Sequence, residues 1–138
     1  MKLAVDAYYA GSKAKVVGVL FENFSDEKPI KTISKVVGDV APYESGSFYK
    51  RELPCIVSLL QDLDVRDISL IVIDGFVYLD DEGGYGLGGH LYEHLERRVQ
   101  IVGVAKSPFK GSCKLVREIC RGRSKRPLFV SAVGTDLD

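Results

Sequence analysis

Residues 66–75 read RDISLIVIDG, with four consecutive aliphatic residues at 70–73. Such an uninterrupted apolar run is typical of a strand that is buried on both faces of an α/β sheet. The strand is expected to end at Asp74, which Gly75 follows. Open α/β sheets bind their ligands outside the carboxyl ends of their strands. The stretch therefore predicts an α/β fold with Asp74 in a candidate site.

Elements on both sides of this strand extend the pattern. Period-two alternation predicts further strands, and apolar residues spaced three to four apart predict helices. The expected elements are strands at 2–9, 13–23, 28–40, 99–107 and 127–134 and helices at 47–63, 88–98 and 114–122. By fold-level analogy, this order resembles the ribonuclease H-like arrangement, a mixed sheet of five or slightly more strands with helices on both faces.

The composition suits one compact domain spanning 1–138. With 46% hydrophobic and 28% charged residues, a chain of 138 residues can bury a sizeable core. The sequence shows neither a charged leader with an apolar core nor an apolar run of the roughly 20 residues that a membrane span needs. Its three cysteines have no metal-ligand spacing. We therefore expect a cytoplasmic protein with no membrane partner.

Charge is unevenly distributed along a chain whose net charge is zero. Residues 1–96 hold 9 Lys/Arg against 16 Asp/Glu, whereas residues 97–126 hold 10 Lys/Arg against Glu118 alone. An acidic cluster followed by a basic stretch is the pattern expected for a polyanionic partner that is reached through a metal ion. A solvated helix face followed by a basic loop would give the same pattern.

Three carboxylates fall on separate predicted elements that are otherwise apolar. Asp6 lies on the first strand, Glu52 near the start of the first helix, and Asp74 at the end of the strand at 66–75. Bringing them together without positive charge is costly, because like charges and desolvation both disfavour the ionised forms. Hard oxygen ligands suit Mg²⁺, or Mn²⁺, better than zinc. The set predicts a divalent metal site, although Asp and Glu are ordinarily surface residues.

Five blocks, in order along the chain, together resemble the endonuclease V family. They are AVDAYY (4–9), PYESGSFYKRELP (42–54), IDGFVYLDDEGGYGLGGHL (73–91), IVGVAKS (101–107) and PLFVSAVG (127–134). The resemblance implies a ribonuclease H-like fold and an Mg²⁺-dependent endonuclease. Such an enzyme cuts one phosphodiester beyond a deaminated purine, hypoxanthine, in DNA or RNA.

The resemblance also implies roles for individual residues. It makes Asp6, Glu52 and Asp74 the metal-binding carboxylates and places Lys106 near the active site, where its charge would suit the scissile phosphate. Glycines at 46, 75 and 86 match those that leave room for a flipped-out base, although ordinary turn geometry also explains glycine. Pro42 and Tyr43 match the first half of the wedge that, in the family, fills the gap left in the base stack by the flipped-out base. The residues expected to bind substrate are thus Pro42, Tyr43, Gly46, Gly75 and Gly86.

One departure from the family bears on catalysis. The family has His-Pro-Arg where this chain has Asp80-Asp81-Glu82, and Asp80 stands at the place of the histidine. Asp80 could act as a base or as a further metal ligand, or it could be only the rim of a loop. Two other functions therefore stay open. One is a catalytically impaired module that binds nucleic acid or protein, and the other is a metal phosphoesterase with a different substrate.

Overall fold

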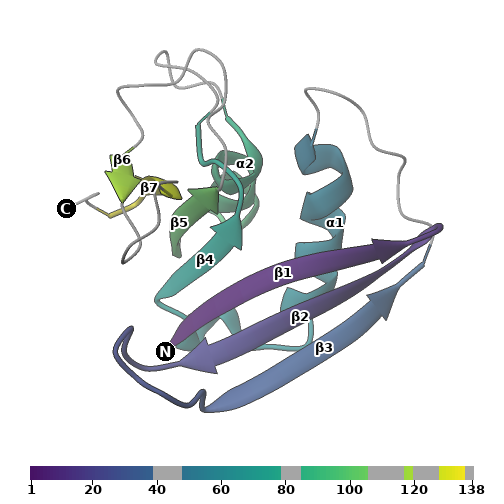
Figure 1. Cartoon of the computed structure of the whole chain (residues 1–138), viewed down its shortest axis with the longest axis horizontal. Helices are drawn as coiled ribbons and strands as arrows, with labels where there is room; N and C mark the ends of the chain where they lie inside the picture. The colour runs from purple at the N-terminus through teal and green to yellow at the C-terminus, as the bar shows by residue number, and fades with distance from the viewer. Residues whose placement is uncertain (39–47, 79–84, 106–116, 120–127, 136–138) are drawn as a thin grey trace. The chain divides into compact units, whose positions relative to one another are not determined.

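A computed structural model describes residues 1–38, 48–78, 85–105, 117–119 and 128–135, with the side chains of 48–50 left out (Figure 1). In these residues the strands are β1 (Lys2–Ala10), β2 (Lys13–Phe21), β3 (Lys31–Val37), β4 (Leu70–Asp74), β5 (Gln100–Ala105), β6 (Arg117–Ile119) and β7 (Leu128–Val133). The helices are α1 (Phe48–Leu60), the short 3₁₀ helix η1 (Val65–Asp67) and α2 (Leu87–His94). None of the helices described is long and apolar enough to span a membrane.

The strands belong to a seven-stranded sheet in the order β3-β2-β1-β4-β5-β7-β6. Neighbours β1 and β2, β2 and β3, β5 and β7, and β6 and β7 are antiparallel. Strands β4 and β5 run in the same direction, so the sheet is mixed (Figure 1). The predicted α/β class is confirmed. The chain divides into two compact units, Met1–Ile71 and Val72–Asp138.

The first unit is a three-stranded meander with α1 on one face. Strands β1 and β2 pair over their full lengths around a tight turn at Gly11, whose φ of 62° favours glycine. Helix α1 contacts β1, β2 and β3 and lies behind them in Figure 1. A Cβ at Gly18 would stand 3.0 Å from the side chains of both Leu3 and Leu59, so glycine lets the helix approach the sheet closely.

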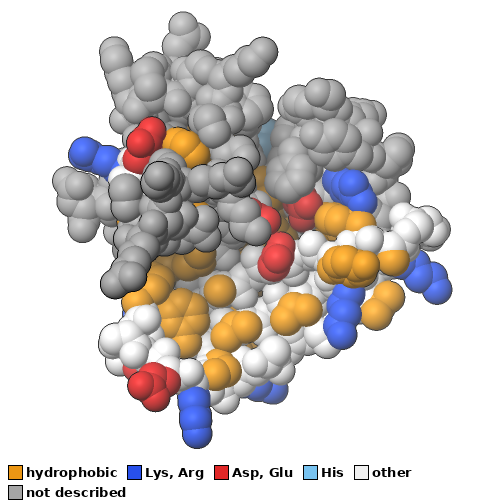
Figure 2. All heavy atoms as spheres, viewed as in Figure 1, with side chains coloured by type: hydrophobic (Ala, Val, Ile, Leu, Met, Phe, Trp, Pro, Cys, Tyr) orange, Lys and Arg blue, Asp and Glu red, His pale blue; other side chains and the backbone are white. Residues whose placement is uncertain are grey.

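Alternation along the strands separates a covered face from an open one. Successive side chains of a strand point to opposite faces. Leu3 and Val5 of β1 are buried on the face that α1 covers, with Val16 and Leu20 of β2 beside them. The opposite face carries Tyr8, which is 72% exposed. Figure 2 shows apolar side chains interspersed with basic ones over these strands, and we call this the open face.

Helix α1 forms where the apolar stripe predicted it, within 47–63. Its buried apolar residues recur at helical spacing: Cys55, Ile56, Leu59 and Leu60. Pro54 lies inside the helix and is exposed, although proline removes one backbone hydrogen bond. Burial of the apolar stripe against the sheet therefore outweighs the loss of that bond.

The second unit packs α2 against β5 and β7. Helix α2 ends at His94, whereas the sequence predicted a helix to residue 98. Glu96 and Arg97 adopt left-handed conformations, with φ of 57° and 60°, and the Arg97 N–H donates to the carbonyl of Tyr92. This reversal of the chain lets Val99 enter the core immediately before β5, where it is buried. Tertiary burial thus ends the helix earlier than its periodicity implied.

The helix predicted at 114–122 is wrong for the part that the structure describes. Residues Arg117–Ile119 form β6, an exposed edge strand. They pair with β7 from Arg117 opposite Val130 to Ile119 opposite Leu128. A short segment with few apolar residues fits a period of two or of 3.6 equally well, so its periodicity decides little. The unpaired edge of β7 offers backbone hydrogen bonds, and these decide the conformation.

Candidate functional site

Asp6 lies on the open face of the first unit. Its side chain is exposed, and its Oδ1 accepts a hydrogen bond from the backbone N–H of Ala7 at 2.9 Å. Val17 stands opposite it on β2. Because a carboxylate on an exposed strand face keeps its hydration, Asp6 can bind a hydrated cation at little desolvation cost.

Glu52 has the opposite environment. It lies on the second turn of α1 and is only 8% exposed. Its carboxylate is close to the hydroxyl of Tyr9, which alternation along β1 places on the face opposite to Asp6. Burial raises the pKa of Tyr9 far above its usual value, and the nearby charge of Glu52 raises it further. Asp6 thus lies on the open face, and Glu52 on the face that α1 covers.

Asp74 is the last residue of β4 and is exposed, as its position in the sequence predicted. Gly75 follows with a φ of 147°, a conformation that favours glycine, and its N–H donates to the carbonyl of Val104 at 2.9 Å. Turn geometry therefore accounts for Gly75 without reference to a substrate. Directly after the Asp74 carboxylate the chain passes over Gly103 of β5, where an added Cβ would clash with the Gly75 carbonyl oxygen.

Gly86 precedes the first turn of α2 in the second unit. Its N–H donates to the carbonyl of Val77 at 2.9 Å, and its carbonyl accepts the first helical bond, from the N–H of His90 at 3.1 Å. Gly86 is buried and has an extended conformation. Pro42, Tyr43, Gly46, Asp80 and Lys106 lie outside the described residues, so their roles stay predictions.

A cluster that sequence reasoning missed surrounds Glu52. The guanidinium carbon of Arg51 lies 3.6 Å from the centre of the Tyr9 ring. The Arg51 Nε is buried and makes no hydrogen bond to any described residue, and the buried Tyr9 hydroxyl lies against Glu52. Cys55 lies one turn further along α1, and burial raises the pKa of its thiol. The sequence offered one signal, because Arg51 directly precedes Glu52 in the block resembling endonuclease V.

A second cluster holds together the two ends of the segment that contains Asp80. Tyr78 and Tyr85 form an isolated antiparallel bridge, with ring centres 6.0 Å apart. The Tyr85 hydroxyl donates to Glu93 at 2.7 Å, and Arg97 donates to the same carboxylate oxygen at 2.7 Å. These bonds lower the pKa of Glu93. Both ends of the segment are therefore fixed against α2 and the turn that follows it.

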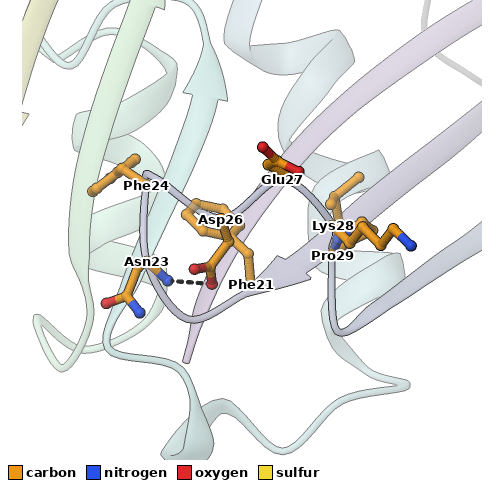
Figure 3. A pocket seen from close by; sticks show the side chains of 8 residues that line it. Phe21, Asn23, Phe24, Asp26, Glu27, Lys28 and Pro29 are labelled. Atoms are coloured by element: carbon orange, nitrogen blue, oxygen red, sulfur yellow. Dashed lines mark hydrogen bonds between the residues drawn. The ribbon is translucent and has the colours of Figure 1, made fainter.

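A surface cavity of about 300 Å³ lies elsewhere in the first unit, where β2 leads into β3 (Figure 3). The backbone N–H of Asn23 donates to Asp26 at 2.9 Å beside it. None of the residues predicted for the site lines this cavity. Its lining consists of Val19, Phe21, Asn23, Phe24, Asp26, Glu27, Lys28 and Pro29.

The described residues include oxygen donors that suit a hard cation, but these donors do not form an assembled coordination site. Three carboxylates on β1, α1 and β4 fit the oxygen preference of Mg²⁺. A buried carboxylate such as Glu52 also gains from a nearby positive charge. Within the described ranges, no group of three or more His, Cys, Asp or Glu side chains is arranged to hold a metal ion.

No protein-family model and no curated protein matches the sequence. Solved structures do match. Endonuclease V from Ciona intestinalis, in complex with a 24mer DNA containing an inosine followed by a ribo-adenosine, superposes with a TM-score of 0.78 at 18% identity, covering 95% of this chain and 70% of that one. Human ENDOV superposes with a TM-score of 0.70 at 23% identity, covering 94% of this chain and 68% of that one. Endonuclease V from Bacillus subtilis superposes with a TM-score of 0.66 at 18% identity, covering 95% of this chain and 63% of that one.

These identities are low, and what the likeness establishes is the fold. The chain has the fold of the endonuclease V structures, which is ribonuclease H-like. The fold expected from the order of elements and from the five sequence blocks is therefore confirmed.

Proposed function

We propose that this chain is an endonuclease V-like, divalent-metal-dependent endonuclease that cuts a phosphodiester near deaminated purines in DNA or RNA. The observation that carries the proposal is the agreement of two independent features. The fold superposes on endonuclease V over 95% of the chain, including a structure with inosine-containing DNA. Asp6, Glu52 and Asp74 stand on β1, on α1 and at the end of β4, where the resembling sequence blocks carry the metal-binding carboxylates.

Asp6, Glu52 and Asp74 would hold the cation, and the hardness of their oxygen ligands favours Mg²⁺, with Mn²⁺ as an alternative. The bound ion would neutralise charge on the scissile phosphodiester. Asp6 and Asp74 are exposed and keep their water shell, whereas Glu52 is buried and already desolvated. The assignment of all three carboxylates to one ion rests on the resemblance, because Asp6 lies on the open face of β1 and Glu52 on the face that α1 covers.

The other proposed roles belong to residues around this set. The Lys106 ammonium would contact the scissile phosphate, and Asp80 would take the proton of the attacking water in place of the family's histidine. Gly46, Gly75 and Gly86 would border the pocket for a flipped base, and Pro42 and Tyr43 would fill the gap in the stack. The partner is thus nucleic acid that contains inosine.

A second candidate function rests on the missing His-Pro-Arg. Its replacement by Asp80-Asp81-Glu82 adds negative charge where the family carries two residues that can be cationic. A chain with this change could bind nucleic acid without cutting it. Positioned proton transfer contributes roughly 10²–10⁴-fold to a rate, so its loss alone could leave almost no measurable activity.

Strand cleavage tests the proposal. Oligonucleotides of DNA and RNA, each with one inosine or with guanosine at the same place, are incubated with the protein in Mg²⁺, in Mn²⁺ or in a chelator. We expect cutting that requires both inosine and a divalent ion and that is lost in Asp74→Asn. The matched control Asp67→Asn changes an exposed carboxylate of η1 and should cut like the parent. Binding of inosine strands without any cutting would favour the second candidate instead.

A further inference from the structure

We propose that Tyr9 is a positioning residue whose ring holds the Arg51 guanidinium ready to bind a phosphate group of nucleic acid beside Glu52. The inference deepens the proposed function, on which it rests for the identity of the polyanion. Neither residue was singled out by the sequence reasoning. Both lie in the first unit and are described completely.

The contact between them is close and specific. The guanidinium carbon lies 3.6 Å from the centre of the Tyr9 ring, well within the roughly 6 Å over which an aromatic face attracts a cation. A guanidinium is planar and delocalised, so an aromatic face also limits its orientation. Tyr9 comes from β1 and Arg51 from α1, and the contact therefore fixes a helix side chain against the sheet.

Arg51 differs from other arginines in its partners. Arg66, Arg97 and Arg98 each form an ion pair with a carboxylate, at distances of 2.9, 2.7 and 2.9 Å. Within the described residues Arg51 has no such ion pair, and its Nε is buried without a hydrogen-bond partner. Arg51 as a whole is only half-buried, and the two outer nitrogens of a guanidinium, Nη1 and Nη2, form a fork of donors that matches two oxygens of a phosphate. A phosphate would thus pair with a guanidinium to which the described part of the protein gives no ion pair.

The Tyr9 hydroxyl extends the cluster toward the proposed ion ligand. It is buried and lies close to the Glu52 carboxylate. The ring contacts Arg51, and the hydroxyl is directed at the next residue of the same helix. Tyr9 therefore links a group suited to phosphate with a group suited to the cation, and these two ligands must meet in phosphodiester cleavage.

The test measures binding of a labelled single-stranded oligonucleotide without inosine, in chelator, over a range of salt concentrations. Binding of single strands weakens with salt by a slope of about 0.7 per phosphate neutralised. We expect Arg51→Gln to reduce the slope by about 0.7. Tyr9→Leu should reproduce that loss, and Tyr9→Phe, which keeps the ring, should not. The double variant Tyr9→Leu/Arg51→Gln should be no worse than Arg51→Gln alone.

Arg66→Gln is the matched control, because it removes an arginine already paired with Asp64 and should leave the slope unchanged. An unchanged slope in Arg51→Gln overturns the inference, and so do additive losses in the double variant. Equal losses in Tyr9→Phe and Tyr9→Leu also overturn it. The assay needs neither a divalent ion nor inosine. A slope change without any cleavage therefore contradicts the proposed function alone, whereas cleavage with an unchanged slope contradicts this inference alone.

Discussion

Ser131 accepts a hydrogen bond at its Oγ from the backbone N–H of Val77 at 3.0 Å, and both residues are fully buried. The bond joins β7 to the segment that follows Asp74. Ser131→Ala would leave a buried N–H unsatisfied, which costs about 1–3 kcal/mol of unfolding free energy. Chemical denaturation measures this loss. Ser34→Ala is the control, because Ser34 is an exposed serine of β3, and it should change stability by less than about 0.5 kcal/mol. Equal effects of the two changes would contradict the prediction.

Gly88 allows α2 to pack directly against Val77. A Cβ on Gly88 would lie 2.7 Å from the Val77 Cγ2 and 2.9 Å from its Cα. Alanine normally stabilises a helix relative to glycine, yet here Gly88→Ala should destabilise the protein by about 1–3 kcal/mol through overpacking. Gly38→Ala meets nothing within 4 Å and should be neutral or slightly stabilising. A stable Gly88→Ala variant, measured by thermal denaturation, would show that this packing is wrong.

His90 should make stability depend on pH. Burial lowers its pKa below the usual value of 6.5, so the folded protein binds fewer protons than the unfolded chain as pH falls below about 6.5. Unfolding free energy should therefore decrease on acidification through that value, and His90→Gln should remove this part of the loss. His94→Gln, on the exposed side of α2, serves as the control. Denaturation at several pH values between about 5 and 7.5 decides the question, because identical profiles for His90→Gln and the parent would refute it.

Metal binding should appear as thermal stabilisation. A ligand that binds the folded state raises its stability in proportion to the logarithm of its concentration once the site is nearly saturated. We expect Mg²⁺ to raise the Tm of the parent, and Glu52→Gln to abolish most of that rise. Glu22→Gln alters an exposed carboxylate directly after β2, and its Tm should rise with Mg²⁺ as that of the parent does. A rise of equal size in the Glu52→Gln variant would remove Glu52 from the proposed ion site.

Hydrophobic periodicity predicted the helices and strands whose apolar pattern is strong. It failed where contacts with distant residues decide the conformation. The apolar run at 70–73 and the stripe of α1 gave β4 and the helix correctly, because burial repeats along them. The segment at 117–119 became a strand only because the edge of β7 was available. The end of α2 likewise depends on burying Val99. Local patterns carry no information about such partners.

In the candidate site, too, the sequence predicted local features and missed contacts between distant residues. Asp74 could be placed from sequence because a strand end is a local feature, and the structure has it exposed there. The stacking of Arg51 on Tyr9 could not, because it joins residues far apart in the chain. Gly75 was predicted as part of a base pocket, and its positive φ gives it a conformational reason as well.

Mapping the cut bond at nucleotide resolution shows whether a deaminated purine directs the cut. An end-labelled strand with one inosine is digested in Mg²⁺, and the product is sized against a ladder. We expect one product, cut one phosphodiester beyond the inosine with a 5′-phosphate on the downstream piece, and no product from Asp74→Asn. Cutting that ignores the inosine, or a folded protein that leaves the strand intact in both Mg²⁺ and Mn²⁺, would contradict the proposed function.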